Sequence, residues 1–220
     1  MIFDMHVHTL YSPRCGWMRP EMLVKHAKEK GLDGLAITDH NTICGAQAVF
    51  DKVNDEQMEF SVIIGEEIST DRGEVLAYFI SEAIEPGSFG DVLREIKRAG
   101  GISSIPHPFD KLRHHAVHLT RKDIGSFDCI EGFNARCLFN KYNDLAYNFA
   151  KDFDLAILAG SDAHFLNEVG NAGIITGQED VRKAIMKKDI TIFGRKSNAL
   201  NHVGTKILKM GRRIRSDLDG

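Results

Sequence analysis

Short apolar runs alternate with amphipathic segments along most of this 220-residue chain. Each run is bounded by turn residues, a pattern typical of buried strands. Strand-then-helix units in succession favour a parallel sheet, because the helix returns the chain to the edge where the strand began. About seven such units predict an α/β fold with a closed or nearly closed TIM-like barrel. The predicted strands cover residues 2–7, 34–38, 61–64, 74–80, 102–105, 129–133 and 155–159.

Five of the intervening segments carry apolar residues at helical spacing. The first begins at Pro20, whose missing N–H costs nothing at a first helical position, and it ends at Gly31. The other predicted helices lie near residues 42–53, 92–99, 142–149 and 179–187.

Length and composition predict a single domain over residues 1–220, with 204–220 as a basic C-terminal tail. A chain of this length can bury a core without disulfides or structural metal ions, so a bound metal is expected to be functional. The 28 Lys and Arg against 31 Asp and Glu leave a net charge of −3, and hence no overall basic field that would collect nucleic acid. The basic tail is either a solvated end or a contact to nucleic acid or a partner.

The four cysteines form no CxxC pair, which indicates a reducing compartment. No charged leader with an apolar core precedes Phe3, and no apolar run approaches the roughly 20 residues that span a bilayer. We therefore expect a cytoplasmic protein that does not bind membranes. The sequence indicates no particular oligomeric state.

Side chains that bind metals follow nearly every predicted strand. The carboxyl ends of parallel barrel strands meet at one rim, where active sites are built, so we expect these side chains to converge. They are His6 and His8 after the first strand, Asp39 and His40 after the second, Glu66 and Glu67 after the third, His107 after the fifth, Glu131 and Asn134 at the sixth, and Asp162 and His164 after the seventh.

Strand alternation points His6 and His8 to the same side, so both imidazoles can reach one metal ion. Imidazole together with carboxylate suits zinc, manganese or iron better than calcium or magnesium. Two hydrogen-bonded, half-buried histidines are the alternative for this pair alone, and the joint pattern over several strands favours the metal.

The other histidines and cysteines carry weaker signals. His114 and His118 fall in a predicted long loop, where exposure or substrate contact is favoured over metal binding. His26 and His202 are interpreted as a helix-surface and a tail residue. Cys44, Cys129 and Cys137 are expected to pack as small apolar side chains.

Six blocks together resemble the polymerase and histidinol phosphatase (PHP) superfamily of metal-dependent phosphoesterases. They are DMHVHTLYS, GLAITDHN, GEEIS followed by GEVLAYF, IPHP, IEGFN and GSDAH, and they span residues 2 to about 176. The resemblance implies a distorted seven-stranded (β/α)7 barrel with two or three divalent ions on its rim. The GSDAHFLNEVGNAG block is like that of small stand-alone members.

The resemblance also implies the ligands. His6, His8, Glu67 and Asp162 would hold one ion, and Glu67 is preferred to Glu66 because it completes a GxE pattern with Gly65. Glu67 and His107 would hold a second ion, with Asn134 nearby or coordinated. His40 and His164 would hold a third, with Asp39 as a ligand or partner. The chain departs from the family at SPRCG, where Arg14 or Cys15 replaces a ligand, and at GEVLAYF, where Val75 and Leu76 cannot coordinate.

The resemblance therefore implies a phosphoesterase that hydrolyses a phosphomonoester or a nucleotide phosphodiester with a metal-activated hydroxide. Arg14 and Arg136 are candidate phosphate donors, with surface salt bridging as the alternative, and Asp39 is a candidate proton donor. The expected partner is a small phosphorylated substrate or nucleotide, with a nucleic-acid end also open. An amidohydrolase-like metal hydrolase and a metal-binding regulatory module without catalysis are the competing interpretations.

Overall fold

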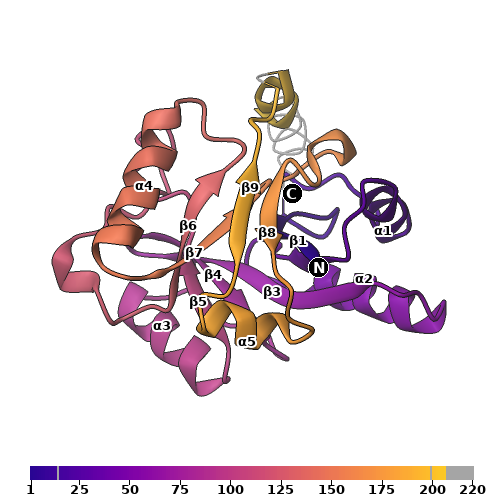
Figure 1. Ribbon diagram of the computed structural model, residues 1–220, viewed down its shortest axis with the longest axis horizontal. Helices are drawn as coiled ribbons and strands as arrows, with labels where there is room; N and C mark the ends of the chain where they lie inside the picture. Colours follow the sequence, from indigo (N-terminus) through magenta and orange to yellow (C-terminus); the bar gives the residue numbers. More distant parts are fainter. Residues whose placement is uncertain (14, 199, 207–220) are drawn as a thin grey trace, which may run out of the picture.

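The computed structural model describes residues 1–13, 15–198 and 200–206, and shows an α/β fold around a nearly closed, barrel-like sheet (Figure 1). Within these described residues, nine strands follow one another in the order β7-β6-β5-β4-β3-β2-β1-β8-β9. The strands are β1 (Ile2–Val7), β2 (Gly34–Ile37), β3 (Ser61–Thr70), β4 (Gly73–Tyr78), β5 (Ile102–Ile105), β6 (Cys129–Asn134), β7 (Ala156–Gly160), β8 (Ala172–Ile175) and β9 (Thr191–Gly194).

All five predicted helices are present, each within a few residues of its predicted ends. Pro20 begins the first of them, and a Ser88 hydroxyl that accepts from the Asp91 N–H at 3.2 Å caps the third. The helices are α1 (Pro20–Glu29), α2 (Cys44–Asp55), α3 (Phe89–Arg98), α4 (Asn140–Asp152) and α5 (Val181–Met186), with single 3-10 turns η1 (Arg121–Asp123) and η2 (Leu166–Glu168).

The seven predicted strands are present, but the expectation of a parallel (β/α)7 sheet was wrong in two places. β4 runs antiparallel to both β3 and β5. The reason is that β3 extends to Thr70 and leaves two residues before β4, a connection too short for a parallel crossover. The short strands β8 and β9, which the sequence pattern missed, add a further antiparallel pair beside β1.

The barrel closes where the chain leaves β7 beside the end of β1. The His8 N–H donates to the Ala163 carbonyl at 3.0 Å, and the Ala163 N–H donates to the His6 carbonyl at 3.3 Å. Residues 6–8 and 161–164 are therefore joined directly, although more than 150 positions separate them along the chain.

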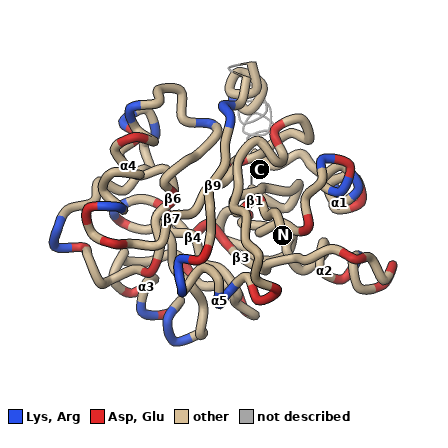
Figure 2. Tube along the Cα trace, viewed as in Figure 1, with Lys and Arg blue, Asp and Glu red and all other residues tan. Residues whose placement is uncertain are grey.

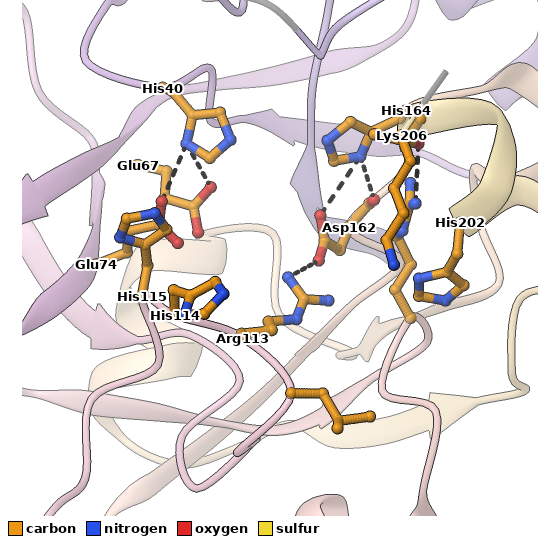
Figure 3. Close-up of a pocket in the computed structure, with 13 residues that line it drawn as sticks. His40, Glu67, Glu74, Arg113, His114, His115, Asp162, His164, His202 and Lys206 are labelled. Atoms are coloured by element: carbon orange, nitrogen blue, oxygen red, sulfur yellow. Dashed lines mark hydrogen bonds and ion pairs between the residues drawn. The ribbon is translucent and has the colours of Figure 1, made fainter. Parts of the chain in front are cut away.

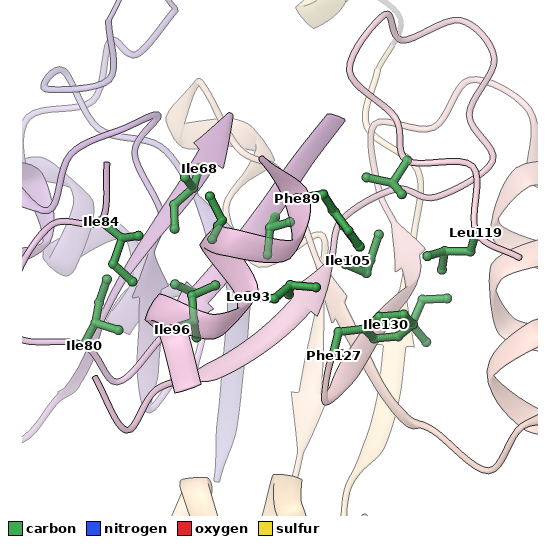
Figure 4. Close-up of a cluster of buried hydrophobic side chains, with 14 of the residues drawn as sticks. Ile68, Ile80, Ile84, Phe89, Leu93, Ile96, Ile105, Leu119, Phe127 and Ile130 are labelled. Atoms are coloured by element: carbon green, nitrogen blue, oxygen red, sulfur yellow. The ribbon is translucent and has the colours of Figure 1, made fainter. Parts of the chain in front are cut away.

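Two apolar layers hold the elements that carry the rim. On the outside, Leu93 and Ile96 of α3 pack against Ile68, Ile105 and Ile130 of the sheet (Figure 4). Inside the barrel, buried side chains from opposite walls pack together: Phe3, Met5, Leu76, Tyr78 and Leu158. The Tyr78 hydroxyl donates to the Met5 carbonyl at 3.0 Å. This interior is a packed core, so ligands have access only at its rim.

Charged residues are mixed along the outer helices and loops, with blue and red segments alternating in Figure 2. Over the residues that the structure describes, no helix has the length and apolar character needed to cross a bilayer. Residues 204–206 of the predicted tail are helical, and residues 207–220 lie outside the described part of the chain.

Candidate metal centre

Histidines and carboxylates from five strand ends meet at one rim of the barrel. Most of them are almost fully buried, including His6 and His8 at 0% and Glu67, His107 and Asp162 at 1% exposure. Burying so many ionisable side chains together is costly unless they pair with one another or bind a metal. The cluster therefore has the composition of a functional site.

His6 and His8 point to the same side of β1, as strand alternation predicts. Their Nε2 atoms lie 3.1 Å apart. On the opposite edge of the His6 ring, Nδ1 is 2.9 Å from Glu131 Oε1. When this Nδ1 carries the proton and donates to Glu131, the lone pair of Nε2 faces the cluster, which is the orientation that metal-binding histidines adopt.

Glu67 lies between the imidazoles of several strands. Its Oε2 is 3.4 Å from His8 Nε2, 3.5 Å from His6 Nε2 and 3.0 Å from His40 Nδ1, and its Oε1 is 3.2 Å from His107 Nε2. Burial raises the pKa of Glu67, but His40 and His6 outweigh it and hold that pKa well below its usual value. The carboxylate is thus ionised at the point where these side chains converge.

Asp162 and His164 come from the loop after β7. Asp162 Oδ1 is 3.4 Å from His8 Nε2, and its Oδ2 is 2.6 Å from Arg113 Nη1. His164 Nδ1 donates to the Asp162 carbonyl at 2.9 Å, which leaves its Nε2 available. Asp162 has a φ of 55° and His107 a φ of 30°, left-handed conformations that turn the chain sharply just after β7 and β5.

Glu74 is a site residue that the sequence analysis missed. Because β4 is antiparallel to its neighbours, its beginning rather than its end lies at the rim. Glu74 Oε1 is 3.5 Å from His40 Nδ1, and Oε2 is 3.8 Å from His107 Nε2. Val75 and Leu76 cannot coordinate, as stated, but the strand still contributes a carboxylate. Burial and the charge of Glu67 raise the pKa of Glu74 well above its usual value.

Asn134 supports the ligands instead of facing Glu67. Its Nδ2 donates to Glu131 Oε2 at 2.9 Å and to Asp162 Oδ2 at 3.2 Å. Its Oδ1 accepts from the Arg136 N–H at 2.9 Å and from Arg113 Nη2 at 3.3 Å. These four contacts use its polar atoms and orient the Asp162 carboxylate.

Asp39 is bound to the loop that follows β1. Oδ1 accepts from the Thr9 N–H and Oδ2 from the Thr9 hydroxyl, both at 2.6 Å. Burial raises the pKa of Asp39, and His8 and Thr9 oppose that effect. The contacts place Asp39 beside the ligands as a tie between β1 and β2. The other candidate near this loop, Arg14, lies outside the described residues.

Arg136 is 5% exposed and its terminal nitrogens are occupied by protein groups. Nη1 is 3.1 Å from Glu168 Oε2, and Nη2 donates to Thr205 Oγ1 at 2.9 Å. Arg113, which the sequence analysis did not single out, is the arginine that contacts Asp162. The sequence carries little indication of this contact, because Arg113 lies in a loop, where no repeating pattern of apolar residues shows which way a side chain points.

A pocket of about 350 Å³ opens above the cluster (Figure 3). His40, Glu74, Asp162 and His164 line it together with Arg113. His114 and His202 also line this pocket, so His202 is part of the site and is not the tail residue that the sequence suggested. His118 does not line it.

Among the residues that the structure describes, three groups of side chains fit a divalent ion, since one donor atom from each member lies within 4.8 Å of the others. Imidazole nitrogens and carboxylate oxygens are the donors that zinc, manganese and iron take. The close approach of the two Nε2 atoms and the mutual repulsion of Glu67 and Glu74 are both relieved by a cation. The groups are His6, His8 and Glu67; His8, His40 and His164; and His40, Glu67 and Glu74.

Known proteins share this fold. A two-domain protein from Bacteroides vulgatus, described as containing a predicted PHP-like metal-dependent phosphoesterase, superposes with a TM-score of 0.72 at 19% identity, over 89% of this chain and 65% of that one. At this identity, the likeness establishes the fold alone.

Sequence relatives extend the comparison. An uncharacterized protein of Methanocaldococcus jannaschii is 32% identical over 189 residues, which cover 83% of this chain and 73% of that protein. The 5′-3′ exoribonuclease Rnm of Salmonella typhimurium is 39% identical over only 70 residues, or 32% of this chain and 23% of the enzyme. A model of the PHP domain matches residues 4–168, which include every predicted ligand. The chain belongs to the PHP domain family.

Proposed function

We propose that this protein is a metal-dependent phosphoesterase that hydrolyses a phosphomonoester or a nucleotide phosphodiester. The observation that carries the proposal is the position of Glu67, whose two oxygens face different histidines of one cluster. A carboxylate placed in this way can be shared between two ions. The donor set supports two or three ions of zinc, manganese or iron.

Ions held at this cluster would supply a hydroxide nucleophile near neutral pH and would neutralise the oxygens of the phosphoryl group. His6, His8, Glu67 and Asp162 would hold one ion, and His40, His107, His164 and Glu74 complete the remaining positions. Asn134 holds the Asp162 carboxylate in place through Nδ2. Glu131 would hold the proton on His6 Nδ1, which would leave the lone pair of Nε2 for an ion.

Arg113 is the best-placed cation for a phosphate oxygen, because it lines the pocket beside Asp162. Its planar guanidinium can keep one N–H on Asp162 and direct another to the phosphate. The contacts of Asp39 with Thr9 favour a role in holding the loop after β1 over a role as proton donor. The 70-residue match to an exoribonuclease supports the inclusion of nucleotides in the proposed substrate class.

The test begins with protein stripped of metal by a chelator and reloaded with manganese, zinc or iron. We expect release of phosphate or cleavage of a phosphodiester only after reloading, and loss of that activity in His6→Ala and Asp162→Ala. His26→Ala on α1 and Asp55→Ala at the end of α2 are matched controls that should retain it. Full activity in the chelated sample contradicts the proposal.

The same assay separates the competing functions. An amidohydrolase-like enzyme would turn over an amide or a cyclic imine and leave phosphoesters intact. A regulatory module would bind the metals tightly, as measured by calorimetry, and show no turnover on either panel.

A further inference from the structure

The helical residues 200–206 form one wall of the metal-centre pocket. His202, Thr205 and Lys206 line it, across from the side formed by His40 and Glu74 (Figure 3). These residues follow the part of the chain that matches the family model, which ends at residue 168. The wall is therefore supplied by a part of this chain outside the family match.

Arg136 joins this wall to the rim. Its Nη2 donates to Thr205 Oγ1 at 2.9 Å and to the Asn201 carbonyl at 3.4 Å. Its Nη1 is 3.1 Å from Glu168 Oε2, which also accepts from the His164 N–H at 3.0 Å. One buried network thus fixes the wall relative to the loop that carries His164.

Packing also holds residues 200–206 against the loop after β7. Asn167 Nδ2 donates to Asn201 Oδ1 at 3.3 Å. A Cβ on Gly204 would lie 3.1 Å from the Phe165 ring, so the helix backbone comes very close to the loop after β7. The wall is therefore in direct contact with the site and has a defined position.

The wall differs in charge from the floor of the pocket. The floor carries the carboxylates of Glu67, Glu74 and Asp162, whereas the three wall residues include no acid and one lysine. Burial, together with the charges of Arg136 and Arg113, lowers the pKa of His202 to about 4, so its imidazole is neutral at pH 7. A neutral hydrogen-bonding ring and an ammonium group face the space beyond the cluster.

We propose that this wall contacts the leaving group of the substrate, that Lys206 pairs with an anionic group on that leaving group, and that Arg136 is a positioning residue that holds the wall in place. The inference rests on the proposed phosphoesterase function. A phosphoryl group held over the carboxylate floor would leave the remainder of the ester facing residues 202–206. The substrate class is then a phosphoester with a second anionic group.

The probes are phenyl phosphate and 4-carboxyphenyl phosphate, which differ by one anionic group. With metal-loaded protein, we expect a higher kcat/KM for 4-carboxyphenyl phosphate. Lys206→Ala should remove about tenfold of that preference by raising KM with kcat unchanged, while Lys206→Arg retains it. Lys187→Ala, an exposed lysine after α5, is the matched control and should keep the preference.

Thr205 tests the positioning role of Arg136. Thr205→Val removes the hydroxyl that accepts from Arg136 and should lower the preference for 4-carboxyphenyl phosphate as Lys206→Ala does. Thr205→Ser keeps a hydroxyl and should retain that preference. Binding of the two matching phosphonates, measured by calorimetry, gives a readout that does not depend on turnover, and thermal melts show whether each variant folds.

The outcomes are distinguishable. If the wild-type protein hydrolyses neither ester and cleaves no nucleotide phosphodiester, the proposed function fails. If it hydrolyses both but shows no preference, or if Lys206→Ala keeps the preference, the inference about the wall is overturned while the proposed function stands.

Discussion

His6 Nδ1 lies 2.9 Å from Glu131 Oε1, and the second oxygen of Glu131 accepts from the His107 N–H at 2.7 Å. One buried carboxylate therefore orients a side chain from β1 and the backbone after β5. Burial lowers the pKa of His6, but the charges of Glu131, Glu67 and Asp162 outweigh it and raise that pKa well above its usual value. Protons and metal ions thus compete for the same imidazole.

Glu131→Gln is predicted to weaken metal binding by about 10- to 100-fold. Glu131 accepts three hydrogen bonds, from His6 Nδ1, the His107 N–H and Asn134 Nδ2, and glutamine replaces one of its accepting oxygens with an amide N–H₂. The variant can therefore no longer orient His6 and the backbone after β5 together. Competition with a fluorescent chelator measures the change. Glu82→Gln, at an exposed position, is the control, and an affinity equal to the wild type in Glu131→Gln would show that the orientation of His6 is set elsewhere.

Glu74→Gln separates repulsion from metal binding. Without metal, the variant should melt at the wild-type temperature or above it, since the pKa of Glu74 is raised by burial and by Glu67. With saturating manganese or zinc, the variant should gain less in melting temperature than the wild type does. Metal binding stabilises the folded protein, and a tenfold loss of affinity removes about 1.4 kcal/mol of that stabilisation. Differential scanning calorimetry with and without metal measures both, with Glu179→Gln as control. An unchanged gain would remove Glu74 from the ligand set.

Gly160→Ala tests the close approach of β7 to β1. A Cβ at this position would lie 2.3 Å from the Cβ of His6 and 3.0 Å from Glu131 Oε1. We expect a loss of about 1–3 kcal/mol in unfolding free energy and weaker metal binding, because the strands must separate at the ligand. Denaturant titration measures the loss. Gly177→Ala, where no atom lies within 4 Å of the added Cβ, should change neither property.

Asp123 gives a pH-dependent prediction away from the metal centre. It accepts from Arg72 Nη1 at 2.6 Å and from the Thr120 N–H at 2.8 Å. The Arg72 hydrogen bond outweighs burial and lowers the pKa of Asp123 from 3.8 to about 2. A depressed folded pKa stabilises the protein above pH 4, and this stability is lost as the pH falls from about 4 to about 2.

Asp123→Asn should therefore lower the unfolding free energy at pH 7 by about 1–2 kcal/mol, and the gap to the wild type should narrow below pH 4. Urea melts across this pH range measure it, with Asp55→Asn as the exposed control. A gap that is constant with pH would mean that the Asp123 charge contributes nothing.

The sequence predicted the seven strands and the convergence of His6, His8, Glu67 and Asp162 because both follow local rules. Apolar runs mark buried strands, and side chains after such strands meet at one rim. The same rules failed at Glu74, since they assume parallel strands, and the direction of β4 depends on how far β3 extends. β8 was missed because only a single 3-10 turn separates it from β7, so it falls outside the alternation of strands and helices.

The positions of Arg136 and His202 could not be predicted from local pattern. Both depend on residues 200–206 packing against the loop after β7. Nothing in the spacing of apolar residues along the sequence indicates that these two segments meet. Asn134 falls in the same class, because its position in the GFN block does not reveal that its side chain turns toward Asp162.

The reversed direction of β4 has a consequence for cation preference. His107 and Asp162 project from loops, whereas Glu74 sits at the start of a strand that is paired on both edges. Exchange of this one side chain for histidine would change the net charge of the cavity by one without disturbing any loop. A single substitution can thus shift the metal preference of such a barrel between ions that favour oxygen ligands and ions that favour nitrogen ligands.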